Sequence, residues 1–310
     1  MRPQRAAPRW RLIAGFLLAL ALPVGGARAE SPQKEEAPAT TPGLFDSGKL
    51  LATGGVSQLE GAGGGGLTPW ALIAGYGTQD SIGANVHYTI VAVDDYNLQS
   101  AGVAIGLFDR LELSYARHEF DTQSKGAALG LRKGYTFGQD IWGAKLRLAG
   151  DAVYDQDTWL PQIAVGAQWK IADHAAVLAA VGARDHTGVD YYLAATKVLL
   201  DESLLLNGTV RLTKANQTGL LGFGGDRDDG YSVELEGSAA VLLSRHFAIG
   251  IEYRSKPDNL AFAKEDDWAD LFVAWFPTKN VSVTAAYVEL GDVATSRNQR
   301  GIYLSAQVGL

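Results

Sequence analysis

The sequence predicts an all-β fold, a transmembrane antiparallel up-and-down β-barrel of about 16 strands. The first observation is the final segment, in which apolar or small residues alternate with small or polar ones up to the last residue, Leu310. A period of two places one set of side chains on each face of a sheet, so one face can meet lipid and the other a polar interior. The second observation is an export signal at the N-terminus. The third is that no apolar run after Glu30 is long enough for a membrane helix.

Residues 1–29 have the organisation of a cleaved secretory signal peptide. Several arginines precede an apolar stretch over residues 12–24, and small residues lead up to a cleavage site between Ala29 and Glu30. A membrane anchor would need about 20 apolar residues, and this run ends sooner. Residues 30–48 are rich in Pro, Ala, Glu and Lys, which predicts a disordered periplasmic leader. We therefore expect residues 49–310 to form a single barrel in the outer membrane.

Composition excludes several classes of site and partner. Removing residues 1–29 deletes five arginines and no acids, so the net charge of −7 becomes −12. This balance argues against nucleic acid, because binding phosphate backbones needs clustered Lys and Arg. The chain has no cysteine, which excludes disulfides and thiolate metal sites. We expect outer-membrane lipid as the surroundings and small polar solutes as possible ligands, while protein partners and substrate stay undefined.

Strand number follows from connection lengths, since outer-membrane barrels have short periplasmic turns and longer external loops. Residues 231–243 show the alternation most clearly, with Val233 and Leu235 on one face and Glu234 and Glu236 on the other. Counting back from a periplasmic C-terminus assigns connections 291–300, 255–267, 215–230, 185–188 and 154–158 to the outside, and 277–280, 244–246, 201–202 and 172–173 to the periplasm.

This order fails at the short turn around Asp109 unless a further strand lies within Gly126–Lys133. With that strand the count is about 16, and residues 61–68 form the first external loop. Without it, and with the glycine-rich start folded into the lumen, the count falls to about 14.

Charged side chains fall on the predicted inner face of several strands. If the hairpin around Arg245 keeps Leu243 opposite Phe247, Glu236 lies across from Arg254, and Glu234 across from Lys256. Charges of both signs on a lumen wall suit a channel, but such pairs could equally fill a narrow barrel, and pairing alone favours neither. The predicted lumen-lining residues are Arg110, Glu112, Lys145, Arg147, Arg211, Glu234, Glu236, Glu252 and Arg254.

Other candidate sites are weak. The run Gly61–Gly66 resembles a phosphate loop, but Leu67 stands where the loop needs its lysine, so an external loop or a segment packed in the lumen is the better interpretation. The acidic clusters 226–229 and 265–267 lack the ligand spacing of a calcium loop. The five histidines are scattered along the chain. We therefore predict no catalytic residue, no metal site and no cofactor.

A family resemblance rests on the segments 54–61 (GGVSQLEG), 65–71 (GGLTPWA) and 75–78 (GYGT). Residues 160–166 (LPQIAVG) and 299–305 (QRGIYLS) carry it further along the chain. In these segments the sequence resembles an uncharacterised bacterial outer-membrane β-barrel family, the domain of unknown function 3034. The resemblance implies location and fold but no activity and no functional residues.

The leading hypothesis is a non-enzymatic outer-membrane barrel that forms a passive, porin-like path for small polar solutes, because its inner face is charged. A structural or assembly component of an envelope polysaccharide or adhesion system is the alternative, on the basis of acidic external loops and the leader. A lipid-modifying barrel enzyme is the third. It would need a Ser or Asp beside a His at the lipid face.

Overall fold

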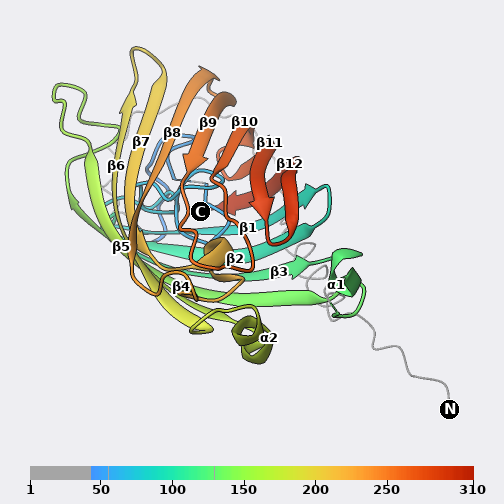
Figure 1. Ribbon diagram of the computed structural model, residues 1–310. Helices are drawn as coiled ribbons and strands as arrows, with labels where there is room; N and C mark the ends of the chain where they lie inside the picture. The colour runs from blue at the N-terminus through green and yellow to red at the C-terminus, as the bar shows by residue number, and fades with distance from the viewer. Residues whose placement is uncertain (1–42, 55, 129) are drawn as a thin grey trace, which may run out of the picture. The chain divides into compact units, whose positions relative to one another are not determined.

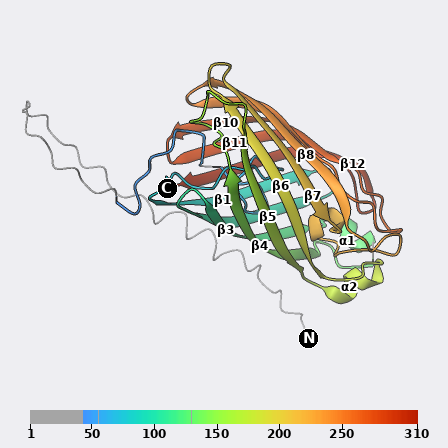
Figure 2. The same cartoon turned by 90° about the vertical axis from the view of Figure 1, so that its left-hand side faces the viewer.

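The computed structural model describes residues 43–54, 56–128 and 130–310. Within them, twelve antiparallel strands form a closed barrel in which each strand pairs with its neighbours in sequence and β12 pairs with β1 (Figures 1 and 2). The strands are β1 (Ile82–Val93), β2 (Asn97–Leu107), β3 (Leu111–Asp121), β4 (Thr136–Ala149), β5 (Gln162–Ala172), β6 (Thr187–Leu199), β7 (Leu204–Thr213), β8 (Ser232–Ser244), β9 (Phe247–Arg254), β10 (Trp268–Thr278), β11 (Val281–Val293) and β12 (Ser296–Gly309). The predicted all-β antiparallel barrel is confirmed.

The two ends of the barrel differ. One end carries the helices α1 (Lys125–Ala128) and α2 (Ala175–Ala180) and the 3-10 helix η2 (Asn216–Gly219), all in connections between strands. We call it the loop end. The C-terminus lies at the opposite end, which we call the C-terminal end (Figure 2). None of the helices in the described part of the chain is long and apolar enough to cross a membrane.

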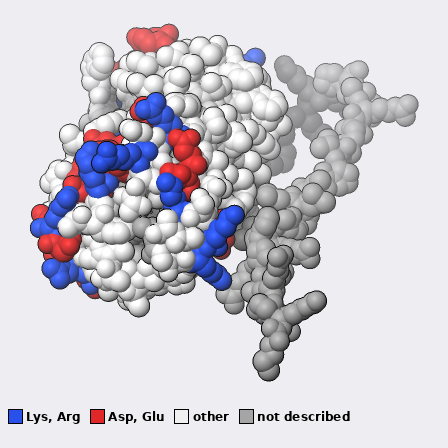
Figure 3. Space-filling model, turned by 45° about the vertical axis from the view of Figure 1, so that its right-hand side comes forward, with Lys and Arg blue, Asp and Glu red and all other residues white. Residues whose placement is uncertain are grey.

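The alternation of side chains separates an apolar outer face from a polar inner face. In β12, Ile302 and Leu304 are 49 % and 51 % exposed, whereas Tyr303, Ser305 and Gln307 are buried inside the barrel. The same pattern runs through the other strands, because neighbouring residues of a strand point to opposite faces. Figure 3 shows most of the charged side chains on one part of the face in view and a few at its upper edge, with much of the surface between them free of Lys, Arg, Asp and Glu.

The predicted count of 16 strands is wrong, and so is the alternative of 14. Residues 126–133, expected as a strand, contain most of α1 and a turn, and residues 173–186 form a single connection that includes α2. The segments on either side of residues 61–68 do not join the barrel, whose first strand begins at Ile82.

Two of these errors cancelled in the topological count. The sequence of α2, AAVLAA, is apolar and about as long as a strand, but its alanines favour a helix. Counting it as a strand reversed the order of inside and outside, and the false strand at 126–133 restored it. The connections between the two false strands were therefore assigned to the wrong ends of the barrel. Residues 154–158 lie at the C-terminal end and residues 172–173 at the loop end, opposite to the prediction.

The proposed signal peptide, with its cleavage site at Ala29 and Glu30, lies outside the described residues. So does the leader up to residue 42.

Candidate functional site in the lumen

Residues 56–77, which we call the lumen segment, lie inside the barrel (blue in Figure 1). The segment folds back on itself through two bridges, Ser57 with Gly63 and Gly64 with Pro69. Its backbone amides donate to inward side chains of the wall, as from Ala71 N to Thr196 Oγ1 at 2.8 Å. The glycine-rich run 61–66 is therefore packed in the lumen and is not an external loop.

The glycine-rich run cradles an anion, and that anion is Glu252 of β9. The backbone N–H groups of Gly66 and Leu67 donate to Glu252 Oε2 at 2.6 and 2.7 Å, and Thr68 Oγ1 donates to Glu252 Oε1 at 2.9 Å. Successive amides of this kind form a concave anion site. A side chain at Gly65 would be excluded, since its Cβ would lie 1.9 Å from Glu252 Oε1. The glycine-rich run therefore binds an anion through its backbone amides, as a phosphate loop does. Here the anion is a carboxylate of the barrel wall and not a phosphate.

A second contact joins the lumen segment to the pair Glu112 (β3) and Lys145 (β4), whose charged atoms lie 3.1 Å apart and are buried. Glu112 accepts from Gly63 N at 3.0 Å and from Ala74 N at 2.8 Å. Lys145 Nζ donates to the carbonyl oxygens of Gly63 and Leu72, both at 2.8 Å. Each charge of the pair thus holds backbone groups of the segment as well as its partner.

The third contact is a buried charge cluster around Glu60, the acidic residue of the lumen segment. Glu60 pairs with Lys170 of β5, with Arg254 of β9 at 2.9 Å and with Arg211 of β7 at 3.7 Å. Two carboxylates of the wall complete the cluster. Asp190 lies 2.6 Å from Lys170 and 3.3 Å from Arg211, while Glu236 pairs with Arg211 and lies 3.4 Å from Arg254.

Charge balance in this cluster depends on the lumen segment. The wall supplies three cations, Lys170, Arg211 and Arg254, and two carboxylates, Asp190 and Glu236. Glu60 brings the third carboxylate and makes the cluster neutral. Because an unpaired buried charge is costly, Glu60 has a strong reason to stay in place. Without it, the wall of the barrel would carry one excess positive charge at this level.

From the loop end, η2 closes over the same cluster. Its four residues are buried, and the carbonyl oxygen of Thr218 accepts from Lys170 Nζ at 3.1 Å. Gln217 and Thr218 have φ angles of 44° and 62°, which are strained for residues other than glycine. Such strain persists only where the surroundings hold the backbone firmly.

A carboxylate outside the strands fixes η2. Gln217 N donates to Glu265 Oε1 at 2.6 Å, and Lys256 Nζ lies 3.0 Å from Gln217 Oε1 and 3.5 Å from Glu265 Oε2. Burial raises the pKa of Glu265 to about 7, although Lys256 and the amide of Gln217 act in the opposite direction. Burial likewise lowers the pKa of Lys256.

The predicted lumen-lining residues fall into several places. Glu112 with Lys145, Glu252, and the group Arg211, Glu236 and Arg254 are buried in the lumen and contact the lumen segment or its partners. Glu236 lies opposite Arg254, as predicted, although a bulge places Ser244 rather than Leu243 opposite Phe247.

The remaining predicted residues lie nearer the ends of the barrel. Arg147 pairs with Asp109 and with Asp151, and Arg110 is exposed in the turn before β3. Glu234 accepts from Ser255 Oγ at 2.5 Å rather than pairing with Lys256.

Sequence reasoning missed Glu60, Lys170 and Asp190. The alternation that selected the other residues also applies to Lys170 and Asp190, which lie on inward positions of β5 and β6 next to outward Trp169 and Tyr191. Nothing in the alternation indicates Glu60, because its segment is not a strand. The signal was a lone carboxylate directly before the glycine-rich run 61–66.

The buried histidines have structural contacts. His87 Nε2 lies 3.2 Å from Ser100 Oγ, but that hydroxyl donates to the carbonyl oxygen of Leu59 at 2.6 Å. His118 Nε2 contacts the same carbonyl at 2.8 Å. This Ser and His pair lies under the lumen segment and not at the lipid face that a lipid-modifying site would need. Among the described residues no group of three or more His, Cys, Asp and Glu could hold a metal ion.

Comparison with protein families gives a match over residues 53–307 to the family described as "Protein of unknown function (DUF3034)". The chain belongs to this family. The match covers the lumen segment and nearly all of the barrel, so both are parts of the DUF3034 domain. No curated protein matches the chain.

Several solved outer-membrane barrels resemble the chain weakly. The KdgM porin is 11 % identical, with 72 % of this chain and 98 % of the porin covered and a TM-score of 0.46. The COG4313 outer membrane channel from Pseudomonas putida F1 is 13 % identical over 78 % of this chain and 96 % of the channel, with a TM-score of 0.43. Outer membrane phospholipase A from Escherichia coli is 9 % identical over 76 % and 94 %, with a TM-score of 0.42.

Proposed function

We propose that this DUF3034 protein is an outer-membrane channel for small polar solutes, and that the lumen segment and η2 close it. The observation that carries the proposal is the charge cluster around Glu60. The wall supplies three cations and two carboxylates to this cluster, and the cluster reaches neutrality only through a carboxylate that the lumen segment supplies.

The outer surface supports a location in the membrane. Large apolar side chains on alternate positions are exposed around the barrel, among them Ile105, Leu193, Leu235, Leu271 and Leu304. A lipid-facing band of this kind is typical of outer-membrane barrels, in which closure leaves no unpaired strand edge. With the C-terminal end in the periplasm, the loop end and η2 face outward.

The contacts that hold the lumen segment can be exchanged for water and ions. Glu60 of the segment pairs with cations of the wall, and Glu112 and Glu252 of the wall accept hydrogen bonds from the segment; each of these groups can be solvated when the segment shifts. A polar wall behind a polar plug is what a path for polar solutes requires, whereas a barrel filled only for stability could use apolar side chains.

Planar-bilayer conductance tests the proposal with the variant Glu60→Gln. Removing one partner from buried ion pairs costs about 3–5 kcal/mol, so the segment should leave the closed position far more often than in the unmodified protein. We expect rare openings from the unmodified protein and frequent ohmic steps from the variant. Glu202→Gln, in an exposed turn, is the matched control and should behave as the unmodified protein does. Folded Glu60→Gln protein without conductance steps would overturn the proposal.

The filled lumen also favours the second candidate, a structural or assembly component of the envelope. A barrel that serves as a fixed platform needs no open path, and its closing segment could remain in place permanently. Crosslinking in cells followed by purification distinguishes the two functions. A stoichiometric periplasmic partner, together with absent conductance in Glu60→Gln, would support the platform.

A further inference from the structure

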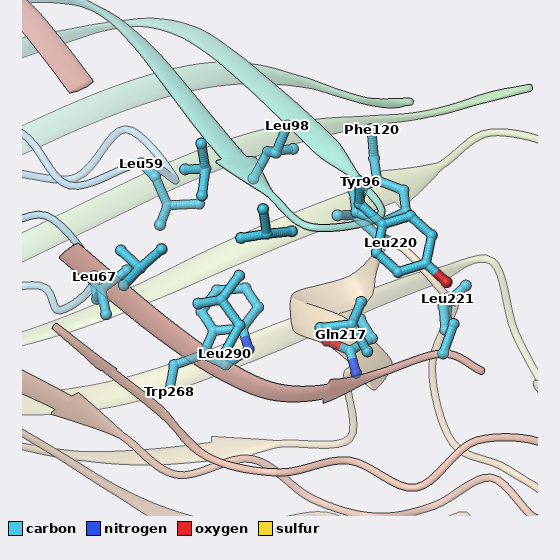
Figure 4. Close-up of a pocket in the computed structure, with 15 residues that line it drawn as sticks. Leu59, Leu67, Tyr96, Leu98, Phe120, Gln217, Leu220, Leu221, Trp268 and Leu290 are labelled. Carbon is cyan, nitrogen blue, oxygen red and sulfur yellow. The ribbon is translucent and has the colours of Figure 1, made fainter. Parts of the chain in front are cut away.

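An apolar cavity lies between the lumen segment and the loop end of the barrel (Figure 4). Leu59 and Leu67 of the lumen segment form one side, and Leu220 and Leu221, which follow η2, form another. The remaining lining side chains come from the five strands β1, β2, β3, β10 and β11, from two hairpin connections and from Gln217 of η2, and nearly all of them are apolar. The polar lumen thus has an apolar compartment above the charge cluster.

The cavity adjoins an open apolar groove at the loop end. Tyr96, Phe120, Leu221 and Ala294 line both. The rest of the groove is lined mainly by α2, by the connection between β3 and β4, and by Phe137 and Phe262. The inner cavity has a volume of about 40 Å³ and the groove one of about 410 Å³. A molecule entering from the loop end could therefore place its body in the groove and only a narrow tip inside.

One polar group of the inner cavity is unsatisfied. Trp268 is 5 % exposed, and its indole Nε1 has no hydrogen-bond acceptor among the described residues. Leaving such a donor buried without an acceptor costs about 1–3 kcal/mol. Lys256 Nζ lies 4.6 Å from the centre of the same ring and adds a positive charge nearby. Both features favour a ligand with a hydrogen-bond acceptor at its tip.

We propose that the cavity and groove bind a slender apolar molecule, aromatic or alkyl, with one hydrogen-bond acceptor directed at Trp268. The small inner volume excludes a polypeptide segment, and the apolar lining excludes a sugar or a free ion. Binding to the cavity and groove does not require the barrel to conduct. A bound ligand would contact Leu59, which precedes Glu60, and Leu67, whose N–H donates to Glu252.

Binding can be measured with two small monosubstituted benzenes, acetophenone and ethylbenzene, of which only acetophenone offers an acceptor. Radiolabelled probe is equilibrated by dialysis with the full-length mature protein in nanodiscs, and uptake by empty nanodiscs is subtracted. We expect saturable binding of acetophenone at one site, and weaker binding of ethylbenzene. Val91→Phe fills the cavity and should reduce affinity at least tenfold, whereas Val103→Phe, on the exposed outer face, should not.

Trp268→Phe separates the role of the donor from that of the cavity. It removes the N–H but retains an aromatic ring, so it should lower the preference for acetophenone over ethylbenzene and leave ethylbenzene binding nearly unchanged. Because Val91→Phe could disturb folding, Leu220→Phe provides a second cavity-filling variant. No saturable binding, or equal binding by the Val91, Leu220 and Val103 variants, would overturn the site. A folded protein that binds the probe yet never conducts would contradict only the channel.

Discussion

Glycines of the lumen segment bring its backbone close to carboxylates of the wall. A Cβ at Gly63 would lie 2.8 Å from Glu112 Oε2, and one at Gly65 would lie 1.9 Å from Glu252 Oε1. These positions need glycine because a side chain would occupy the space of the anion itself. The glycine run is thus the complement of the acidic residues on β3 and β9.

Gly65→Ala should therefore loosen the lumen segment. Overpacking of a tight site costs about 1–3 kcal/mol. Here the added methyl group would collide with the carboxylate of Glu252, which is buried and held in place by four hydrogen bonds. We expect faster protease cleavage within residues 56–77 of the folded barrel, followed by mass spectrometry. Gly208→Ala is the control, since a Cβ there meets nothing within 4 Å. Equal cleavage of both variants would show that this close approach does not hold the segment.

Glu265 predicts a pH dependence at the loop end. Its pKa is raised from 4.5 to about 7 by burial, with Lys256 and Asp258 as the neighbouring charges. Because the pKa is higher in the folded state, the fold favours the protonated carboxyl of Glu265. The contribution of Glu265 to folding stability is therefore full below pH 4.5 and is lost as the pH rises through about 7.

We expect the amides of η2 to exchange hydrogen faster above about pH 8 than below about pH 6, after correction for intrinsic rates. Glu265→Gln should remove that difference, because an amide does not titrate in this range. A difference that persists in Glu265→Gln would assign the pH response to another group.

At the scale of elements, sequence alternation predicted the strands well and the exceptions poorly. Residues 231–243 alternate cleanly and form β8. The apolar sequence of α2 carries no alternation that distinguishes a short helix from a strand. Once α2 was counted as a strand, the alternation of periplasmic and external connections required a second false strand. The lumen segment was equally ambiguous, because its apolar residues pack inside the barrel and not against lipid.

Because the lumen segment packs against the wall, a disulfide can be introduced between the segment and β8. Thr68 Oγ1 of the lumen segment lies 2.6 Å from Ser238 Oγ of β8, and the chain has no cysteine of its own. The double variant Thr68→Cys, Ser238→Cys should form a disulfide, since the two hydroxyl positions already approach bonding geometry. In the Glu60→Gln background, oxidation should suppress conductance and a reducing agent should restore it. The single variant Thr68→Cys should respond to neither treatment, and conductance through the oxidised double variant would place the path elsewhere.

At the scale of the whole molecule, the sequence could indicate which side chains face inward but not what fills the space between them. Arg211, Glu236 and Arg254 would alternate in the same way around water or around a plug. The deciding partner, Glu60, lies about 110 residues from Lys170 and 194 from Arg254. A contact over such distances has no local pattern, so the filling of the lumen by residues 56–77 is visible only in the structure.

Opening the barrel should expose the charges of its wall, and ion selectivity reports their balance. With Glu60→Gln the central cluster keeps three cations against two carboxylates, while Glu252, released from the glycine-rich run, adds one carboxylate to the same wall, so the test uses the change in selectivity when single wall charges are removed. Adding Lys145→Ala leaves Glu112 without its cation, and adding Arg147→Ala leaves Asp109 and Asp151 with one cation fewer. Each change should move the reversal potential in a salt gradient toward cation selectivity.

Arg300→Ala removes the same charge at an exposed pair with Glu289, so it should leave the potential unchanged. Equal shifts from all three variants would show that surface charge, and not the lumen wall, sets the selectivity.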